Sequence, residues 1–307
     1  MQDVLVVGEA LVDIVRRGQG PPDEYPGGSP MNVAVGLARL GHHVRLLTRL
    51  GDDARGATVR RFLAESGVEL APGSIVPGPT STAAAVLDAA GVATYEFAID
   101  WAIPEHVDLG TASALHTGSI AAFLPPGGEA VARLVEESVG RVTISFDPNT
   151  RPRLMGDPDR ARKQVERLVA ASDVVKVSDE DLAWLAPGAD PADVAADWLD
   201  LGPATVIVTR GGEGATALCR AGRVDIPSPT VRVVDTVGAG DSFMSGLLDH
   251  LAAVGLLGPS ARADLRAVGI DVLERTLRHA ARTAAITCSR AGANPPTRAE
   301  LDAAVPA

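Results

Sequence analysis

Short apolar segments alternate with amphipathic segments along most of this chain of 307 residues. In the amphipathic segments apolar residues recur every three or four positions, which is typical of a helix. Strands that are separated by helices form mostly parallel sheets, because each connection must cross back over the sheet. We therefore expect an α/β fold with a mostly parallel sheet covered by helices on both faces. The expected strands are 4–7, 44–48, 114–116, 143–147, 174–177, 205–209 and 215–219, the expected helices are 30–40, 54–66, 127–139, 158–171, 179–186, 191–201, 242–254 and 272–288, and the expected surface connections are 187–191 and 255–269.

Two stretches depart from this alternation. Residues 11–16 and 82–99 have the alternating polarity of strands with one buried and one exposed face, and Ala90 and Gly91 interrupt the second stretch. No internal repeat and no change of composition marks a second domain, so we expect residues 1–307 to form a single domain.

The composition limits the classes of partner. A net charge of −11 argues against nucleic acid, which requires a basic surface. Cys219 and Cys288 lie far apart in the sequence and form no CxxC pair, so we expect neither a disulfide framework nor a zinc site. The apolar run near the N-terminus is too short for a signal peptide, and no stretch is long enough to span a membrane. These features predict a cytoplasmic enzyme without a membrane partner.

The run Asp-Thr-Val-Gly-Ala-Gly-Asp-Ser-Phe at residues 235–243 is the most informative motif. It follows the β-like segment 231–234 and precedes an amphipathic helix. The start of a helix has free backbone N–H groups that can bind an anion, and Gly238 and Gly240 let the anion approach closely. Asp241 then lies in the first turn, where a carboxylate could take a proton from a hydroxyl group. The same carboxylate could instead serve only to stabilise the helix start.

A second motif spans residues 26–34 and contains a predicted helix start. Ser29 and Pro30 suit the N-cap and the first helical position, and Gly41 suits the end of that helix. Asn32 then lies in the first turn, where its amide can donate and accept hydrogen bonds with a polyhydroxylated ligand. By itself this asparagine could equally be a solvated residue near a helix cap.

Together these motifs resemble the paired signatures of the ribokinase-like (PfkB-type) carbohydrate kinases. The resemblance implies a ribokinase-like three-layer α/β/α fold with a mostly parallel central sheet. It also implies a small β-lid over the sugar site, with strands within about 11–26 and 82–100. The matching segments, in the order of the family, are 4–13, 27–34, 51–56, 209–214, 235–243 and 290–293.

The family resemblance also implies an activity and a set of sugar-site residues. The activity is transfer of the γ-phosphoryl group of ATP to a hydroxyl of a small sugar. Asp241 would be the general base, and the backbone N–H groups of Gly238, Ala239 and Gly240 would form the anion hole. The implied sugar contacts are Asp13, Gly28, Asn32, Phe97 and Arg151.

For the nucleotide and its metal ions the resemblance is less direct. Ser178 and Asp181 stand where the family usually has Asn-x-x-Glu, so Asp181 is the expected Mg²⁺ ligand, with a shortened side chain. Asp235 and Thr236 match positions near a monovalent cation, which makes potassium a further expected ion beside ATP and Mg²⁺. The residues expected to bind the nucleotide are Lys176, Ser178, Thr209, Gly211, Gly212 and Gly214.

A dinucleotide pattern also occurs, as Gly212-x-Gly214-x-x-Ala217, but a helix must follow such a pattern. Here the following residues are strand-like, so we reject a dehydrogenase.

The segments 8–10, 116–119 and 146–152 are most similar to the fructokinase branch, which makes D-fructose the expected acceptor. Alternatives are 2-keto-3-deoxygluconate, whose carboxylate could pair with Arg151, and ribose or a nucleoside. A catalytically silent sugar- or nucleotide-binding protein is the alternative from a different class, although such a protein has no need of a base. Exposed edges of a lid sheet would favour a homodimer.

Overall fold

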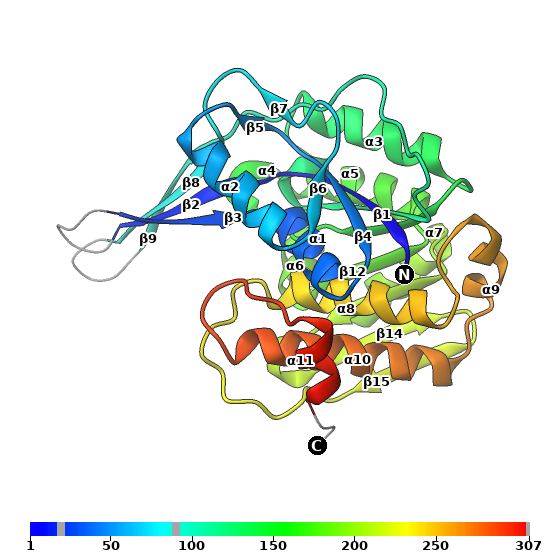
Figure 1. The fold of residues 1–307 in the computed structure, drawn as a ribbon. Coiled ribbons are helices and arrows are strands. Elements are labelled where there is room, and N and C mark those ends of the chain that lie inside the picture. Colours follow the sequence, from blue (N-terminus) through cyan, green and yellow to red (C-terminus); the bar gives the residue numbers. More distant parts are fainter. Residues whose placement is uncertain (17–21, 88–92, 305–307) are drawn as a thin grey trace.

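A nine-stranded sheet forms the centre of the computed structural model, which describes residues 1–16, 22–87 and 93–304 (Figure 1). The first seven strands in the chain order of this sheet pair in parallel, and the last two, at one edge, pair antiparallel. In sheet order the strands are β15 (Gly222–Ile226), β14 (Ala215–Cys219), β13 (Thr205–Thr209), β12 (Val174–Ser178), β11 (Thr143–Asp147), β10 (Ala114–Gly118), β1 (Asp3–Val7), β4 (His43–Leu47) and β6 (Val68–Leu70).

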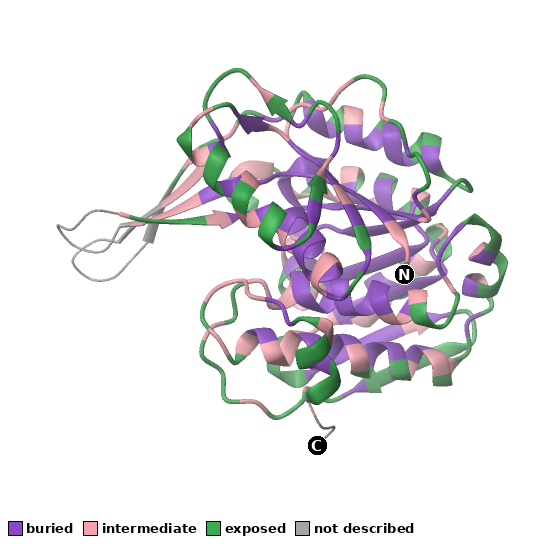
Figure 2. Ribbon diagram, in the orientation of Figure 1, coloured by how far each residue is buried: buried purple, intermediate pink, exposed green. Residues whose placement is uncertain are grey.

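Helices cover both faces of this sheet, and the buried positions concentrate where helices and sheet meet (Figure 2). One face carries α1 (Ser29–Arg39), α2 (Ala54–Glu65), α8 (Ala239–Ala253) and α10 (Ile270–Cys288). The other face carries α3 (Gly127–Ser138), α5 (Pro158–Ala171), α6 (Asp179–Leu185) and α7 (Pro191–Leu201).

Strand β1 shows why the sheet has two cores. Val4 and Val6 pack with the first set of helices, whereas Leu5 and Val7 pack with the second. All four are at most 1% exposed, as expected for a parallel strand that is buried on both faces. The predicted three-layer α/β/α fold is therefore confirmed.

A smaller four-stranded sheet projects from the body (Figure 1). We call it the small sheet. Two of its strands come from the segment between β1 and α1, and one of these, residues 11–16, pairs in parallel with residues 82–87. The predicted turn at Ala90 and Gly91 lies outside the described residues. In order, its strands are β3 (Asp23–Gly27), β2 (Leu11–Arg16), β8 (Thr82–Leu87) and β9 (Ala93–Ala98), and a separate pair is formed by β5 (Leu50–Gly51) and β7 (Ile75–Val76).

Helix α8 lies between α1 and α10 and touches both at glycines. A Cβ atom on Gly36 of α1 would come within 2.4 Å of Ser245 Oγ in α8. A Cβ on Gly246 of α8 would come within 2.6 Å of Thr283 Oγ1 in α10. These two positions let the three helices approach closely.

A buried carboxylate holds the far end of α8. Asp249 is 2% exposed and accepts hydrogen bonds from His42 Nε2 at 2.9 Å and His279 Nε2 at 2.7 Å. It also pairs with Arg298, at the start of α11 (Arg298–Ala303). Asp249 thereby joins α8 to the residues that follow α1, to α10 and to α11.

Two of the expected elements are wrong. The segment 255–269 is not only a connection, since it contains the short helix α9 (Arg262–Arg266), whose Leu265 is fully buried. The β-like segment 231–234 forms no strand: Val233 and Val234 are 59% and 57% exposed. Val234 donates its N–H to the Cys288 carbonyl instead of to a sheet neighbour, so β-branched residues there have no strand to pair with.

Several elements were not predicted from the sequence because they are short. Strand β15 and helix α11 each have six residues or fewer, too few for a clear period. The other short elements that were not expected are strands β5, β6 and β7, helix α4 (Pro152–Met155) and the 3₁₀ turns η1 (Ser119–Ala122), η2 (Gly211–Glu213) and η3 (Pro259–Ala261).

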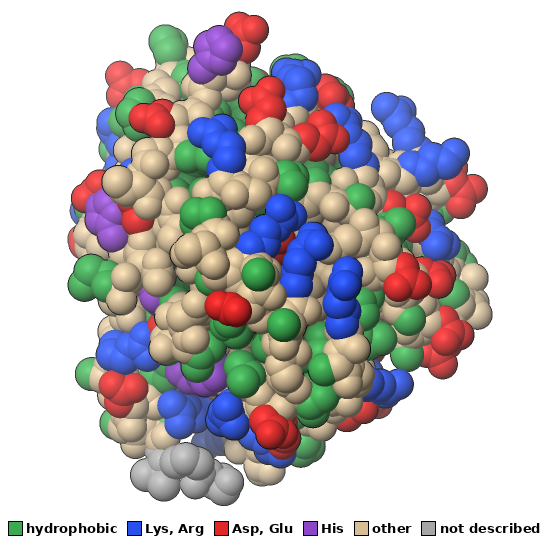
Figure 3. Space-filling model, turned by 90° about the vertical axis from the view of Figure 1, so that its right-hand side faces the viewer, with side chains coloured by type: hydrophobic (Ala, Val, Ile, Leu, Met, Phe, Trp, Pro, Cys, Tyr) green, Lys and Arg blue, Asp and Glu red, His purple; other side chains and the backbone are tan. Residues whose placement is uncertain are grey.

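At the surface, acidic and basic side chains are interspersed on the face shown in Figure 3. Among the described residues, no helix is both long and apolar enough to cross a membrane.

Replacing Leu37 by alanine tests the packing of α1 against the sheet. Leu37 is fully buried, so Leu37→Ala should lower the free energy of unfolding by about 2–5 kcal/mol in urea denaturation. Leu201→Ala is the matched control, because Leu201 is 45% exposed at the end of α7 and should change stability little. Equal losses in the two variants would contradict this account of the core.

Candidate functional site

A cavity of about 610 Å³ lies where the carboxyl ends of the parallel strands meet the small sheet. Crevices outside the carboxyl ends of strands are the usual ligand sites of such sheets. The cavity brings together all five residues expected to contact the sugar, and Asp241 of α8. Its lining includes Glu9, Asp13, Gly28, Ser29, Asn32, Phe97, Ser119, Arg151, Arg153, Gly238 and Asp241.

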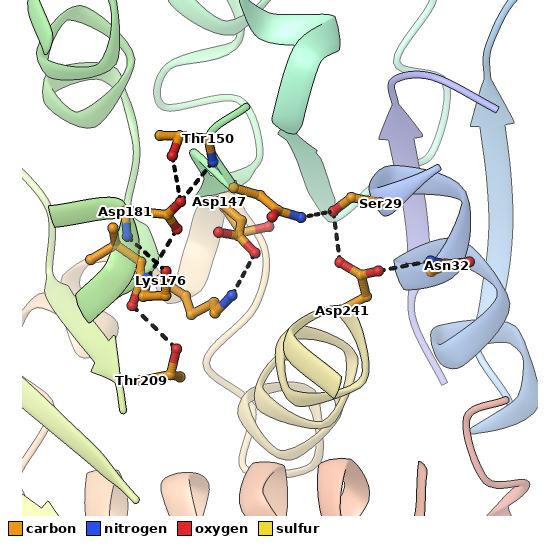
Figure 4. Close-up of polar contacts among 12 residues, drawn as sticks. Ser29, Asn32, Asp147, Thr150, Lys176, Asp181, Thr209 and Asp241 are labelled. Atoms are coloured by element: carbon orange, nitrogen blue, oxygen red, sulfur yellow. Dashed lines mark hydrogen bonds and ion pairs between the residues drawn. The ribbon is translucent and has the colours of Figure 1, made fainter. Parts of the chain in front are cut away.

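Asp241 lies in the first turn of α8 and is 6% exposed. Its Oδ1 accepts a hydrogen bond from Ser29 Oγ at 2.7 Å, and its Oδ2 accepts one from Asn32 Nδ2 at 2.8 Å (Figure 4). A carboxylate offers about four acceptor positions, so each oxygen can still accept a further donor. The first turns of α1 and α8 therefore hold this carboxylate in one orientation at the cavity wall.

The predicted N-cap role of Ser29 is wrong. The N-cap of α1 is Gly28, and no side chain caps this helix. Gly28 has φ +117°, and a Cβ there would come within 2.4 Å of the Glu9 carbonyl oxygen, so a larger residue does not fit. Ser29 is thus shifted into the helix, and its hydroxyl points to Asp241 rather than to its own backbone.

The start of α8 suits an anion. Gly238 has left-handed backbone with φ +75°, and no side chain caps the helix. The first N–H groups of a helix have no acceptor within it, and the helix dipole places positive potential at this end. A Cβ on Gly240 would come within 2.9 Å of Lys176 Nζ, so a cationic side chain lies against the same turn. This combination of donors fits phosphate oxygens.

Lys176 is buried and forms an ion pair with Asp147, with 2.8 Å between Nζ and Oδ2. Burial is the largest single influence and would lower the pKa of Lys176. The charge and hydrogen bond of Asp147, together with the charges of Asp181 and Asp241, outweigh burial and raise that pKa, so the lysine stays cationic. Burial raises the pKa of Asp147 to about 6. Among the described residues nothing donates to Asp147 Oδ1, which is buried.

Asp181 completes a capping box with Ser178 at the start of α6. Ser178 Oγ accepts from the Asp181 N–H at 3.0 Å, and Asp181 Oδ2 accepts from the Ser178 N–H at 3.2 Å. Asp181 Oδ1 accepts from both the N–H and the hydroxyl of Thr150. Oxygen is the ligand that Mg²⁺ prefers, and one acceptor position on Oδ2 is left for a metal or its water. The described residues contain no cluster of three or more potential metal-ligating side chains.

The other residues expected to bind the nucleotide lie at the end of β13 and just after it. Thr209 is at the end of that strand, with Oγ1 3.4 Å from the Val177 carbonyl oxygen. Gly211 and Gly212 have open space around their Cα atoms, whereas a Cβ on Gly214 would come within 2.0 Å of the Ile226 carbonyl oxygen. Gly214 is therefore required by the close approach of β15, and Gly211 and Gly212 leave room for a ligand.

Asp235 joins two loops beside the start of α8. Its carboxylate accepts from the N–H of Val237 at 3.0 Å and of Gly292 at 2.9 Å, and these bonds lower its pKa. The Thr236 carbonyl accepts from Ala239 at 3.1 Å. The Asp235 side chain is thus used to position the loop, and a monovalent cation there stays a prediction.

Three of the expected sugar contacts face the cavity from different elements. Asp13 comes from β2, Phe97 from β9 and Arg151 from the segment before α4. Burial raises the pKa of Asp13 to about 6, against the opposing charge of Arg151. The small sheet and the main sheet therefore both supply walls of the cavity.

Sequence reasoning missed Glu9 and Asn149. Glu9 is 4% exposed, lines the cavity and accepts from the Ala121 N–H at 3.2 Å. Burial raises its pKa to about 7. Asn149 has φ +37°, in the left-handed region, and donates to Ser29 Oγ at 2.7 Å. Both residues follow the end of a parallel strand, which is the one sequence signal that could have identified them.

The raised pKa of Glu9 predicts a pH dependence of stability. The carboxyl of Glu9 ionises near pH 4.5 in the unfolded chain but only near pH 7 in the folded protein. The free energy of unfolding of the wild type should therefore fall by on the order of 3 kcal/mol as pH rises across this window. Glu9→Gln stays neutral, so its free energy of unfolding relative to wild type should rise between pH 4.5 and 7.5. Urea denaturation at several pH values measures this, with the exposed Glu137→Gln as control. A pH-independent difference would contradict the prediction.

Comparisons with known proteins agree with this geometry. The model of the pfkB family of carbohydrate kinases matches residues 1–300. A fructokinase from Rhizobium leguminosarum bv. trifolii is 38% identical over 265 residues, covering 83% of this chain and 81% of that protein.

Solved structures are similar over nearly the whole chain. Fructokinase from Xylella fastidiosa with bound ATP has a TM-score of 0.85 and 27% identity, covering 97% of this chain and 96% of that one. Fructokinase from Vibrio cholerae O395 with fructose, ADP and calcium ion has a TM-score of 0.81 and 26% identity, covering 99% of this chain and 98% of that one. The chain described here belongs to the pfkB family of carbohydrate kinases.

Proposed function

We propose that this carbohydrate kinase transfers the γ-phosphoryl group of ATP to a hydroxyl of D-fructose, with Asp241 as the general base. One observation carries the proposal: the Asp241 carboxylate faces the cavity from the same helical turn whose N–H groups and neighbouring Lys176 suit phosphate. A base for the acceptor hydroxyl and a cradle for the transferred group are thereby adjacent, as phosphoryl transfer requires.

The chemical step follows from this placement. Asp241 accepts the proton of the sugar hydroxyl, whose oxygen forms a bond to the γ-phosphorus. The bond from that phosphorus to the oxygen bridging to the β-phosphate breaks, and ADP leaves with the bond's electron pair. The N–H groups of Gly238 and Gly240, with Lys176, stabilise the negative charge on the transferred group; the Ala239 N–H contributes only as a shared donor, because it also donates to the Thr236 carbonyl. Magnesium bound with ATP neutralises charge between the phosphates.

The acceptor side suits a neutral polyol. Asp13 and Glu9 offer carboxyl oxygens to hydroxyl groups, and Asn32 can both donate and accept. Arg151 adds one cationic donor, which an acid sugar could also use. Similarity to fructokinases, one of them solved with fructose and ADP, supports fructose over 2-keto-3-deoxygluconate, ribose or a nucleoside.

Several finer assignments belong to the same proposal. We infer that Thr209, Gly211 and Gly212 contact the nucleotide, that Asp181 interacts with Mg²⁺, and that potassium binds near Asp235 and Thr236. Residues 1–307 are proposed to act as one domain in the cytoplasm, with the small sheet as a lid. Its edge strands β3 and β9 would allow two copies to pair.

Replacing the base tests the mechanism. Asp241→Asn keeps the shape but cannot accept the proton, so kcat should fall at least about 10²–10⁴-fold. Fructose affinity, measured by calorimetry, should stay close to that of the wild type. The exposed Asp264→Asn in α9 controls for loss of a surface carboxylate. A D241N enzyme that keeps most of its rate would overturn the assignment.

A substrate panel tests the sugar. ADP release is measured with ATP and Mg²⁺ on D-fructose, 2-keto-3-deoxygluconate, D-ribose and adenosine, with and without potassium. We expect the highest kcat/KM with fructose, since the cavity presents carboxyl and amide oxygens to hydroxyls. A clear preference for another acceptor would reject fructose and leave the role of Asp241 intact. No turnover with any acceptor would favour the alternative of a catalytically silent sugar- or nucleotide-binding protein.

A further inference from the structure

A chain of side-chain hydrogen bonds leads from the cavity wall to Asp241, and its last bond, between Ser29 and Asp241, is shown in Figure 4. Arg151 NH1 lies 2.6 Å from Asn149 Oδ1, and Asn149 Nδ2 lies 2.7 Å from Ser29 Oγ. Ser29 Oγ in turn lies 2.7 Å from Asp241 Oδ1. The three bonds join the segment after β11 to the first turns of α1 and α8.

The direction of every bond in this chain is determined by chemistry. Arginine can only donate, so the amide atom of Asn149 that faces Arg151 must be the oxygen. The Asn149 amide nitrogen therefore faces Ser29 and donates to its hydroxyl oxygen. Ser29 has a single proton, and with a donor on its other side this proton must point to Asp241.

The backbone of Asn149 supports this arrangement. Its φ of +37° is in the left-handed region, which asparagine and aspartate tolerate better than other side chains. Arg151 NH1 also lies 2.9 Å from the carbonyl oxygens of both Asn149 and Thr150, so the turn and the guanidinium hold each other in place.

We propose that Arg151, Asn149 and Ser29 form a polarised relay whose last member, Ser29, is a positioning residue for the base. The relay keeps the Ser29 hydroxyl donating its hydrogen bond to Asp241 Oδ1. The carboxylate therefore keeps one orientation, and its remaining acceptor positions face the sugar. Because Arg151 lines the cavity, the relay also connects the acceptor pocket to the base. This inference rests on the proposed role of Asp241.

Ser29→Ala removes the last donor of the relay. We expect kcat to fall about tenfold, the effect of losing one hydrogen bond to a charged group, with KM for fructose and for ATP unchanged. Ser138→Ala is the matched control, because Ser138 is also a buried helical serine with one hydrogen bond but lies in α3. A wild-type kcat in S29A, or a change in KM alone, would overturn the proposal.

Asn149→Asp tests polarity rather than shape. Aspartate has the size of asparagine, tolerates the same φ and still pairs with Arg151, but it can only accept from Ser29. The Ser29 proton should then turn away from Asp241, and kcat should fall about as far as in S29A. In the S29A background the Ser29 hydroxyl is absent and cannot turn, so N149D should cause no further loss of kcat. Equal losses from N149D in both backgrounds would indicate a charge effect and reject the relay.

A readout without substrate separates the relay from the proposed function. In a neutron structure of the deuterated wild type, the Ser29 deuteron should lie between Oγ and Asp241 Oδ1. A deuteron directed to Asn149 would overturn the relay whatever acceptor the enzyme uses. If the deuteron lies as expected but D241N retains its rate, the role of the base fails and the geometry stands.

Discussion

The close approach of α8 to α1 and α10 is the constraint on which the site depends. Gly36 and Gly246 allow these contacts, since a side chain at either position would meet Ser245 or Thr283. Only because α1 and α8 lie so close can Ser29 and Asn32 reach the same carboxylate. Asp249 fixes α8 at its other end through histidines and an arginine from three other segments. A helix held at both ends gives its first turn little freedom, as an oriented base requires.

The fold must also offset the unfavourable free energy of burying charged side chains near the site. Lys176 and Asp147 are each at most 3% exposed, and an unpaired charge at either position would be strongly unfavourable. Their pairing keeps a cation beside the turn that suits phosphate, although the chain as a whole carries a net charge of −11. Attraction of an anionic substrate therefore depends on this local arrangement, because the overall charge repels it.

The sequence predicted the layers well, and the reason is periodicity. Long elements such as α5 and α7 bury one stripe against the sheet, so their apolar spacing is visible, and their bounds agree with the structure. Short elements such as β15 and α9 carry no measurable period.

Contacts between side chains that lie far apart in the sequence could not be predicted. Ser29 suits an N-cap by type, but its actual partner, Asp241, is 212 positions away and requires the α1–α8 packing. Asn149 gave no signal for its left-handed backbone, and the burial that raises the pKa of Glu9 comes from elements distant in sequence. Strand β2 begins two residues after Glu9, and β3 passes directly into Gly28 and the turn of α1 that holds Asp241. The small sheet is therefore not an exchangeable module. A chimaera that takes this sheet from a relative has one junction beside Glu9 in the cavity wall and another beside Ser29, a donor to the base, so acceptor choice and base alignment are inherited together.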